Sequence, residues 1–295
     1  MRTGQDMHAD ASASTQADPA DADAAAGQQP ERSLSPSRAT DFMTCPLLYR
    51  FRAIDRLPEP PTAAAARGTV VHTVLERLFD LPSTARTPEG ARALLEPAWA
   101  ELLAAEPEVG ELFHDDPTGE ALRAWLESGA ELLDRYFTLE DPQRLEPAER
   151  EMYVEATLTS GLQVRGYVDR LDRAPVTGDL RVVDYKTGRA PGPDFEHRPL
   201  FQMRFYGLVL WRMHGVIPRL LQLVYLGNGE VLRYEPDEDD LLATERKLAA
   251  LWAAIERAQR TGEWRARPSK LCDWCAFQSL CPAWGGTPPP LPEQS

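Results

Sequence analysis

The chain has 295 residues, a hydrophobic content of 43% and a formal net charge of −14. This length allows one large domain or two small ones, and the apolar content allows a packed core. No run of about 18 apolar residues occurs and no apolar segment follows the first methionine, so we expect a cytoplasmic protein with neither a membrane span nor a secretion signal.

The first 32 residues are rich in Ala, Asp, Ser, Gln and Gly without periodicity, and they are predicted to form a disordered acidic tail. Ser35 followed by Pro36 is typical of a helix N-cap and first helical position. We therefore expect a helix that begins there and includes Cys45. A proline-rich link at residues 57–63 follows it.

Hydrophobic periodicity predicts the remaining elements. Helices are expected at about residues 67–79, 88–105 and 118–138, strands at 151–158, 162–172 and 180–186, a helix at 195–214, a hairpin of strands 220–226 and 230–234, and a helix at 237–260. This order indicates an α/β fold with a mixed central sheet flanked by helices.

Two short motifs give the clearest chemical signal, Gly166-Tyr-Val-Asp-Arg170 and Val182-Val-Asp-Tyr-Lys-Thr-Gly188. Because side chains alternate along a strand, Asp184 and Lys186 are expected to point to the same side. With Asp169 from a neighbouring strand, they suit a divalent metal that polarises a phosphate and lowers the pKa of a bound water. The alternative is a surface Asp–Lys pair on an edge strand.

Lysine is rare in this chain, which strengthens the interpretation of Lys186. Only Lys186, Lys247 and Lys270 occur among 32 basic residues. An ammonium is a compact charge with a tunable pKa, and a guanidinium cannot replace it in activating water. We therefore expect Lys186 to orient or help to deprotonate the attacking water.

Three further side chains are candidates for the same site. His72 lies on the helix predicted at 67–79, and because imidazole suits Mn²⁺ better than Mg²⁺, a histidine beside two aspartates indicates manganese. The alternative is an ordinary histidine on a helix surface. Gln202 and Tyr206 share one face of the helix predicted at 195–214, where they either contact a phosphate or base or are ordinary helix residues.

The four cysteines form a second group. Cys272, Cys275 and Cys281 follow a C-x₂-C-x₅-C pattern, and Cys45 lies far upstream. In a reducing compartment such cysteines favour metal or cluster binding over disulfides. Structural zinc sites usually consist of two local pairs, so three cysteines plus a remote one favour a [4Fe–4S] cluster over zinc. Unligated cysteines are the remaining alternative.

Together these motifs make the chain resemble the RecB-family exonucleases of the PD-(D/E)XK superfamily, in the branch that has an iron–sulfur cluster. That branch includes CRISPR-associated exonucleases and the nuclease domain of AddB. The resemblance covers about residues 33–283. It rests on Ser-Pro-Ser-x₇-Cys-Pro, Gly-Thr-x-x-His, Gly-Tyr-Val-Asp-Arg, Val-Asp-Tyr-Lys-Thr-Gly, Gln-x-x-x-Tyr and the closing C-x₂-C-x₅-C-Pro.

The resemblance implies a role for each motif residue. Metal ligands are implied at His72, Asp169, Asp184 and the Tyr185 carbonyl, with Mg²⁺ or Mn²⁺ as the ion and Lys186 as the catalytic lysine. Gln202 and Tyr206 are implied to handle DNA, and Cys45, Cys272, Cys275 and Cys281 to hold the cluster. A further acid is implied before the Gly-x-x-Asp strand, and Glu151 and Glu155 both remain open for it.

The net negative charge is unfavourable for a DNA enzyme, but it is unevenly distributed. Residues 32–67 hold six Arg against three acids, and residues 257–270 hold four Arg and one Lys against one acid. These stretches either bind a nucleic acid strand or are ordinary solvated surface.

The sequence therefore predicts a metal-dependent DNA exonuclease that acts on single-stranded ends in repair or recombination. No Gly-x₄-Gly-Lys-Ser/Thr loop occurs, so any unwinding would need a helicase in trans. The alternative function is a non-catalytic DNA-binding or assembly subunit of a helicase–nuclease complex, stabilised by its metal cluster. The expected domains are a tail (1–32), a nuclease domain (33–267), an iron–sulfur segment (268–283) and a flexible tail (284–295).

Overall fold

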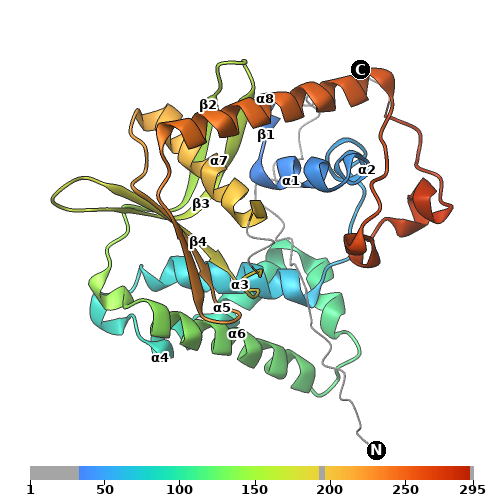
Figure 1. Cartoon of the computed structure of the whole chain (residues 1–295). Coiled ribbons are helices and arrows are strands. Elements are labelled where there is room, and N and C mark those ends of the chain that lie inside the picture. Colours follow the sequence, from blue (N-terminus) through green and yellow to red (C-terminus); the bar gives the residue numbers. More distant parts are fainter. Residues whose placement is uncertain (1–32, 193–196, 293–295) are drawn as a thin grey trace, which may run out of the picture.

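A mixed sheet of six strands forms the centre of the molecule (Figure 1). The computed structural model describes residues 33–192 and 197–292, so the predicted disordered tail at 1–32 lies outside the described residues. The strands are β1 (Ser33–Leu34), β2 (Glu149–Thr157), β3 (Gln163–Arg173), β4 (Leu180–Lys186), β5 (Leu220–Tyr225) and β6 (Glu230–Tyr234). Their order is β1-β3-β4-β5-β6, and β2 pairs with β3.

The strand pairs run in both senses, as expected for a mixed sheet. Strand β3 is antiparallel to β2 and β4, whereas the β1–β3 and β4–β5 pairs are parallel. The predicted hairpin is confirmed as the antiparallel pair β5–β6. Gly229 in its loop has φ 71°, a conformation that glycine adopts without steric cost.

Helices cover both faces of this sheet. One layer consists of α1 (Pro36–Thr44), α2 (Pro46–Tyr49), α7 (His197–His214) and α8 (Glu238–Thr261), and the other of α3 (Ala63–Leu78), α4 (Pro88–Arg92), α5 (Leu95–Ala105) and α6 (Glu120–Leu139) (Figure 1). Two hydrophobic clusters follow this division, because Val182 belongs to the first cluster and Val183 and Tyr185 to the second. The predicted α/β architecture is confirmed.

The first helix begins as predicted, but it ends at Thr44, so Cys45 lies in extended backbone between α1 and α2 and not within the helix as expected. Ser35 is its N-cap, with the Oγ atom accepting the Arg38 N–H at 3.3 Å, and Pro36 occupies the first turn. The two-residue strand β1 directly before it was not predicted.

The helical structure expected at about 88–105 is confirmed, but it consists of two helices rather than one. Helix α4 ends at Arg92 and α5 begins at Leu95. Pro97 explains the break, since inside a continuous helix its ring would clash with the carbonyl four residues earlier and remove a hydrogen bond. In the first turn of α5 the proline is tolerated.

The cysteine segment packs beside α1 and α2. It contains short 3₁₀ turns at Lys270–Trp274, Gln278–Leu280 and Pro282–Trp284. Phe277 contacts Phe51, which lies on the π-helical turn Arg50–Ile54, with ring centroids 5.2 Å apart. The segment predicted as a flexible tail is held at two points, by the Gly286 N–H on the Cys281 carbonyl and by the Arg50 guanidinium on the Pro289 carbonyl.

Within the described ranges, no helix is long and apolar enough to cross a bilayer.

Candidate active site

Three side chains from different elements converge at the point where α3 crosses β2 and β3. They are His72 on α3, Glu151 on β2 and Asp169 on β3, and each offers a ligand atom within 4.8 Å of the others. The apolar residues of α3 are buried against α5, α6 and the inner face of the sheet, which sets the rotation of the helix and turns His72 towards the strands. His72 Nδ1 lies 3.5 Å from Asp169 Oδ2.

The other ring nitrogen of His72 faces the backbone of β4. Nε2 lies 3.1 Å from the Tyr185 carbonyl oxygen. This carbonyl is the one that the family resemblance implies as a metal ligand. A separation of 3.1 Å is that of a hydrogen bond between the ring and the carbonyl, so His72 lies beside the backbone group that the resemblance implies as a ligand.

Asp184 and Lys186 point to the same side of β4, as their spacing predicts. Lys186 Nζ lies 2.7 Å from Asp184 Oδ2 in an ion pair. Gln202 on α7 donates its amide N–H to Asp184 Oδ1 at 3.2 Å. Asp184 is only 3% exposed; its Oδ1 atom accepts the Gln202 amide, whereas its buried Oδ2 atom has the Lys186 charge beside it but no hydrogen-bond partner among the described residues.

The two motif aspartates lie where β3 and β4 separate. Backbone pairing between these strands extends from Arg173–Leu180 to Arg170–Val183. Continuing the register would place Asp169 opposite Asp184, but there the Asp169 carboxylate accepts the Tyr185 N–H at 2.7 Å in place of a backbone carbonyl. A side chain thus closes the gap between the strands at the site.

Glu151, and not Glu155, joins this group. Pairing of β2 with β3 is regular on both sides of Glu151, and its register places Glu151 opposite Asp169. Glu151 itself has φ 43°, a conformation that costs a non-glycine residue about 1–3 kcal/mol. Glu155 instead accepts the hydroxyl of the half-exposed Tyr153 at 2.8 Å. The sequence could not separate the two glutamates, because it does not reveal this backbone distortion.

Tyr206 is placed differently from Gln202. Its side chain is 3% exposed and packs over Gly166. A Cβ atom at Gly166 would lie 2.9 Å from Tyr206 Cε1 and 3.4 Å from Pro36 Cδ. Glycine at the start of the Gly-x-x-Asp motif therefore lets α7 and α1 approach β3 closely.

Burial raises the pKa of Asp169 to about 6; the charges of His72 and Lys186 oppose this rise, and the charge of Asp184 adds to it. Because this pKa is above the unfolded value, the folded state binds the additional proton between about pH 4 and 6, and stability contributed by this group is lost as the pH rises.

We expect the metal-free protein to lose up to about 3 kcal/mol of stability through Asp169 as the pH rises across this interval. Urea unfolding from pH 4.5 to 7.5 measures the trend, and Asp169→Asn should flatten it. Manganese should reverse it in the parent, because the cation competes with the proton. Equal pH dependence in the parent and the variant would contradict the assignment.

The cysteines come together from both ends of the described chain. Cys45 Sγ accepts the Arg267 N–H at 3.4 Å, and Cys272 Sγ accepts the Ser269 N–H at 3.3 Å. Burial raises the pKa of Cys275, and the charges of Cys272 and Cys45 raise it further. The remote cysteine thus lies close enough to interact with the C-terminal group.

The spacing of these sulfurs bears on the ion they could hold. Considering only the described residues, no three of the cysteine sulfurs lie within 4.8 Å of one another. Four thiolates around one zinc ion, at Zn–S bonds of about 2.3 Å, would be about 3.8 Å apart.

Two residues near the site were not singled out from the sequence. Arg170 directly follows Asp169, and Glu140 directly follows α6; the two form a bidentate ion pair at 2.8 and 2.9 Å. Arg170 could have been found, because it is part of the Gly166-Tyr-Val-Asp-Arg170 motif. No motif or local residue pattern includes Glu140.

A model of the PD-(D/E)XK nuclease superfamily matches residues 33–282. This range includes all the site residues described above. Among solved structures, a candidate exonuclease from Eubacterium rectale superposes with a TM-score of 0.55 and 15% identity, over 83% of this chain and 87% of that protein. At this identity the similarity establishes the fold alone.

Two phage proteins are similar in sequence. The Gene 69 protein of Mycobacterium phage D29 is 28% identical over 204 residues, which are 62% of this chain and 70% of the phage protein. The Gene 69 protein of Mycobacterium phage L5 is 22% identical over 286 residues, covering 85% of this chain and 96% of the phage protein. Their names state no activity.

Proposed function

The chain belongs to the PD-(D/E)XK nuclease superfamily, and from this premise we propose that it is a metal-dependent DNA exonuclease acting on single-stranded ends in repair or recombination. One observation carries the proposal. The Asp184–Lys186 ion pair lies beside the group of His72, Glu151 and Asp169, close enough for the charges of Asp184 and Lys186 to act on the Asp169 carboxyl.

The donor atoms fit Mg²⁺ or Mn²⁺. Carboxylates from Asp169, Asp184 and Glu151 and the Tyr185 carbonyl would supply the hard oxygen ligands that both ions prefer, and the His72 imidazole would favour Mn²⁺. A bound divalent ion would supply polarisation of the phosphate and activation of water.

Side chains of the protein would stabilise the charge that develops on the phosphate and hold the ion ligands in place. Lys186 brings an ammonium beside the ion ligands, where it would stabilise the negative charge that develops on the phosphate. Its contact with Asp184 and the contact of Gln202 with the same carboxylate hold that ligand in place. Gln202 would thus act on DNA cleavage through Asp184, and the buried Tyr206 through the close packing of α7 on β3.

The four cysteines would hold a [4Fe–4S] cluster. The charge interaction of Cys45 with Cys275 supports a shared site, and the backbone N–H contacts to Cys45 and Cys272 are of the kind that stabilise cluster thiolates. Brown protein with a broad visible absorbance band after anaerobic purification would support this assignment. Colourless protein with stoichiometric zinc would replace it with a zinc site.

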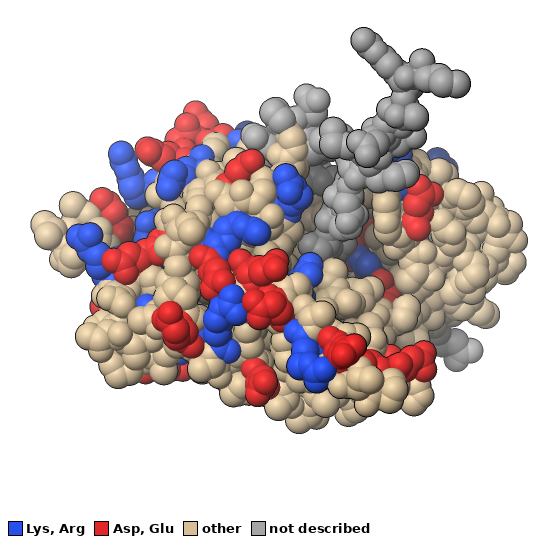
Figure 2. Space-filling model, turned by 90° about the horizontal axis from the view of Figure 1, so that it is seen from below, with Lys and Arg blue, Asp and Glu red and all other residues tan. Residues whose placement is uncertain are grey.

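The charge distribution supports binding of the DNA strand near the cysteines. The face seen from below, on the side of α4, α5 and α6 in Figure 1, shows acidic and basic side chains interspersed, without a continuous basic surface (Figure 2). Residues 257–284 hold five basic against two acidic side chains. Trp274 and Trp284 in this stretch are 66% and 54% exposed, and exposed aromatic rings beside basic residues suit the stacked bases of a single strand.

End-labelled DNA tests the proposal. We expect the protein to shorten 5′- or 3′-labelled single strands with Mn²⁺ or Mg²⁺ and to lose all hydrolysis in EDTA, because the carboxylate group needs its ion. Double strands and circular single strands serve as controls for end dependence.

Two results would count against this function. Strands left intact with either ion would refute hydrolysis, and if DNA is still bound they would instead support the non-catalytic subunit. Cleavage of circular strands at the rate of linear ones would replace the exonuclease with an endonuclease.

A further inference from the structure

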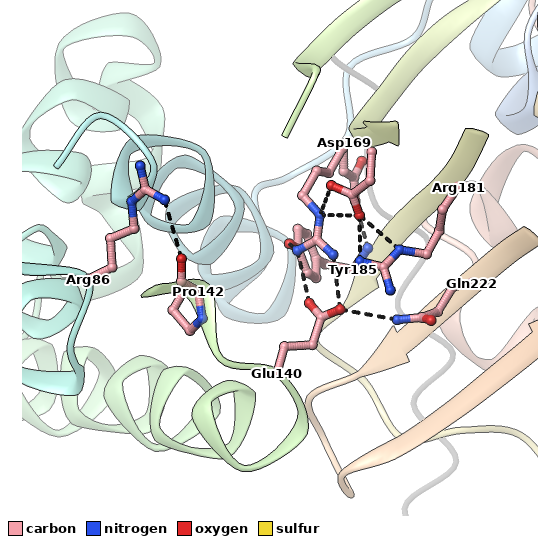
Figure 3. A network of polar contacts seen from close by, with 9 residues as sticks. Arg86, Glu140, Pro142, Asp169, Arg181, Tyr185 and Gln222 are labelled. Carbon is pink, nitrogen blue, oxygen red and sulfur yellow. Dashed lines mark hydrogen bonds and ion pairs between the residues drawn. The ribbon is translucent and has the colours of Figure 1, made fainter. Parts of the chain in front are cut away.

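A buried polar network lies behind the candidate site, between β3, β4 and α6 (Figure 3). At its centre the Arg170 side chain is 1% exposed. Its guanidinium donates to both oxygens of Glu140, at 2.8 and 2.9 Å, and lies 3.1 Å from Asp172 Oδ1. Removing a guanidinium from water is costly, so two carboxylates on one arginine indicate a group that must be held in a fixed place.

Further residues fix these carboxylates in turn. Asp172 forms an ion pair with Arg181 at 2.7 Å, and Glu140 accepts the Gln222 amide at 3.3 Å. Figure 3 shows the labelled side chains of Glu140, Arg181 and Gln222 directed towards the same region. Two arginines balance two carboxylates, so the cluster is neutral overall and rigidly connected.

The network contacts the candidate site at Tyr185, and Arg170 also directly follows Asp169 in the chain. The Arg170 guanidinium donates to the Tyr185 hydroxyl, and burial raises the pKa of this phenol well above its ordinary value, so it stays neutral. The backbone of the same residue donates to Asp169 and lies against His72. Tyr185 also joins Asp184 to Lys186 along the chain.

This connection matters because backbone pairing does not hold Tyr185 on the β3 side. The β3–β4 pairing ends at Arg170–Val183, while β4 remains paired with β5 as far as Lys186–Tyr225. On the side that faces β3, two hydrogen bonds replace the missing backbone pairing. The Tyr185 N–H donates to Asp169, and the Tyr185 hydroxyl accepts from Arg170. Asp169 and Arg170, which are consecutive on β3, thus contact Tyr185 of β4 at its backbone N–H and at its side-chain hydroxyl.

We propose that Arg170 and Glu140 are positioning residues for the cation site, which they act on by fixing the Tyr185 peptide between Asp184 and Lys186. The inference rests on the proposed function, because it presumes that His72, Asp169 and Asp184 hold a divalent ion. Partners that orient metal ligands typically change metal affinity by about 10–100-fold when they are removed.

Tyr185→Phe tests the inference, since it removes only the hydroxyl that Arg170 holds. We expect the Mn²⁺ dissociation constant, measured by electron paramagnetic resonance of the free ion, to rise about 10-fold. Tyr49→Phe is the matched control, because Tyr49 is also buried but lies beside Trp264 on the other side of the sheet. Without metal, the melting temperatures of the two variants should fall by similar amounts. Only Tyr185→Phe should bind Mn²⁺ more weakly than the parent.

Arg170→Lys and Glu140→Gln give independent readings of the same effect. Both should weaken Mn²⁺ binding at least as much as Tyr185→Phe, and Tyr185→Phe alone decides if they fail to fold. Unchanged Mn²⁺ affinity in Tyr185→Phe would overturn the inference while leaving the nuclease proposal intact. A parent protein that binds no Mn²⁺ would instead refute the cation site, and both proposals with it.

Discussion

Replacing Lys186 with alanine is expected to lower the rate of DNA hydrolysis by about 10³-fold, with little change in DNA affinity. The ammonium lies 2.7 Å from Asp184 and is the positive side chain that β4 places beside the candidate ion ligands. Its removal withdraws charge stabilisation from the phosphate and leaves Asp184 with the Gln202 amide. Single-turnover hydrolysis with saturating protein measures the chemical step, and fluorescence anisotropy in Ca²⁺ measures binding.

A second lysine provides the control for this experiment. Lys247 is exposed on α8 and lies 4.5 Å from the Phe201 ring, away from the carboxylates. Lys247→Ala should therefore hydrolyse DNA at the rate of the parent. Lys186→Arg separates two roles, because arginine keeps the charge but cannot exchange a proton at neutral pH. Parental rates in Lys186→Ala would refute the site assignment.

Replacing Cys45 with serine is expected to remove the cluster and to lower the melting temperature by about 10 °C. In the sequence 226 residues separate Cys45 from Cys272, so a shared cluster closes a very long loop. A covalent link across a loop of about 100 residues contributes roughly 4–5 kcal/mol, and a four-thiolate cluster should contribute a similar amount. The visible absorbance band and the thermal unfolding curve provide the two readouts.

The other cysteines and a nearby serine make this result interpretable. Cys272→Ser, Cys275→Ser and Cys281→Ser should each lose the absorbance band and stability as Cys45→Ser does. Ser279→Ala, an exposed change in the same segment, should lose neither. If Cys45→Ser keeps the full visible absorbance band, Cys45 is not a cluster ligand. The cluster would then not link residue 45 to the C-terminal cysteines.

Local physical rules were sufficient for much of the fold. The N-cap at Ser35, the hairpin around Gly229 and the shared face of Asp184 and Lys186 each depend on residues within a few positions of one another. Capping, turn preference and side-chain alternation act at that range, so the sequence expresses them directly. Pro97 is a further local signal, since a proline is tolerated in the first turn of a helix but breaks a continuous helix interior.

The sequence by itself determined the kind of fold, the motif residues and the chemistry that those residue types allow. Only the tertiary structure decided that Glu151 rather than Glu155 meets His72 and Asp169, and that Glu140 pairs with Arg170 beneath them. The physical reason is the separation along the chain: these contacts join residues that come together only after α3, α6 and three strands have packed. Long-range pairing depends on the global arrangement of the elements, and no local pattern of residues records it.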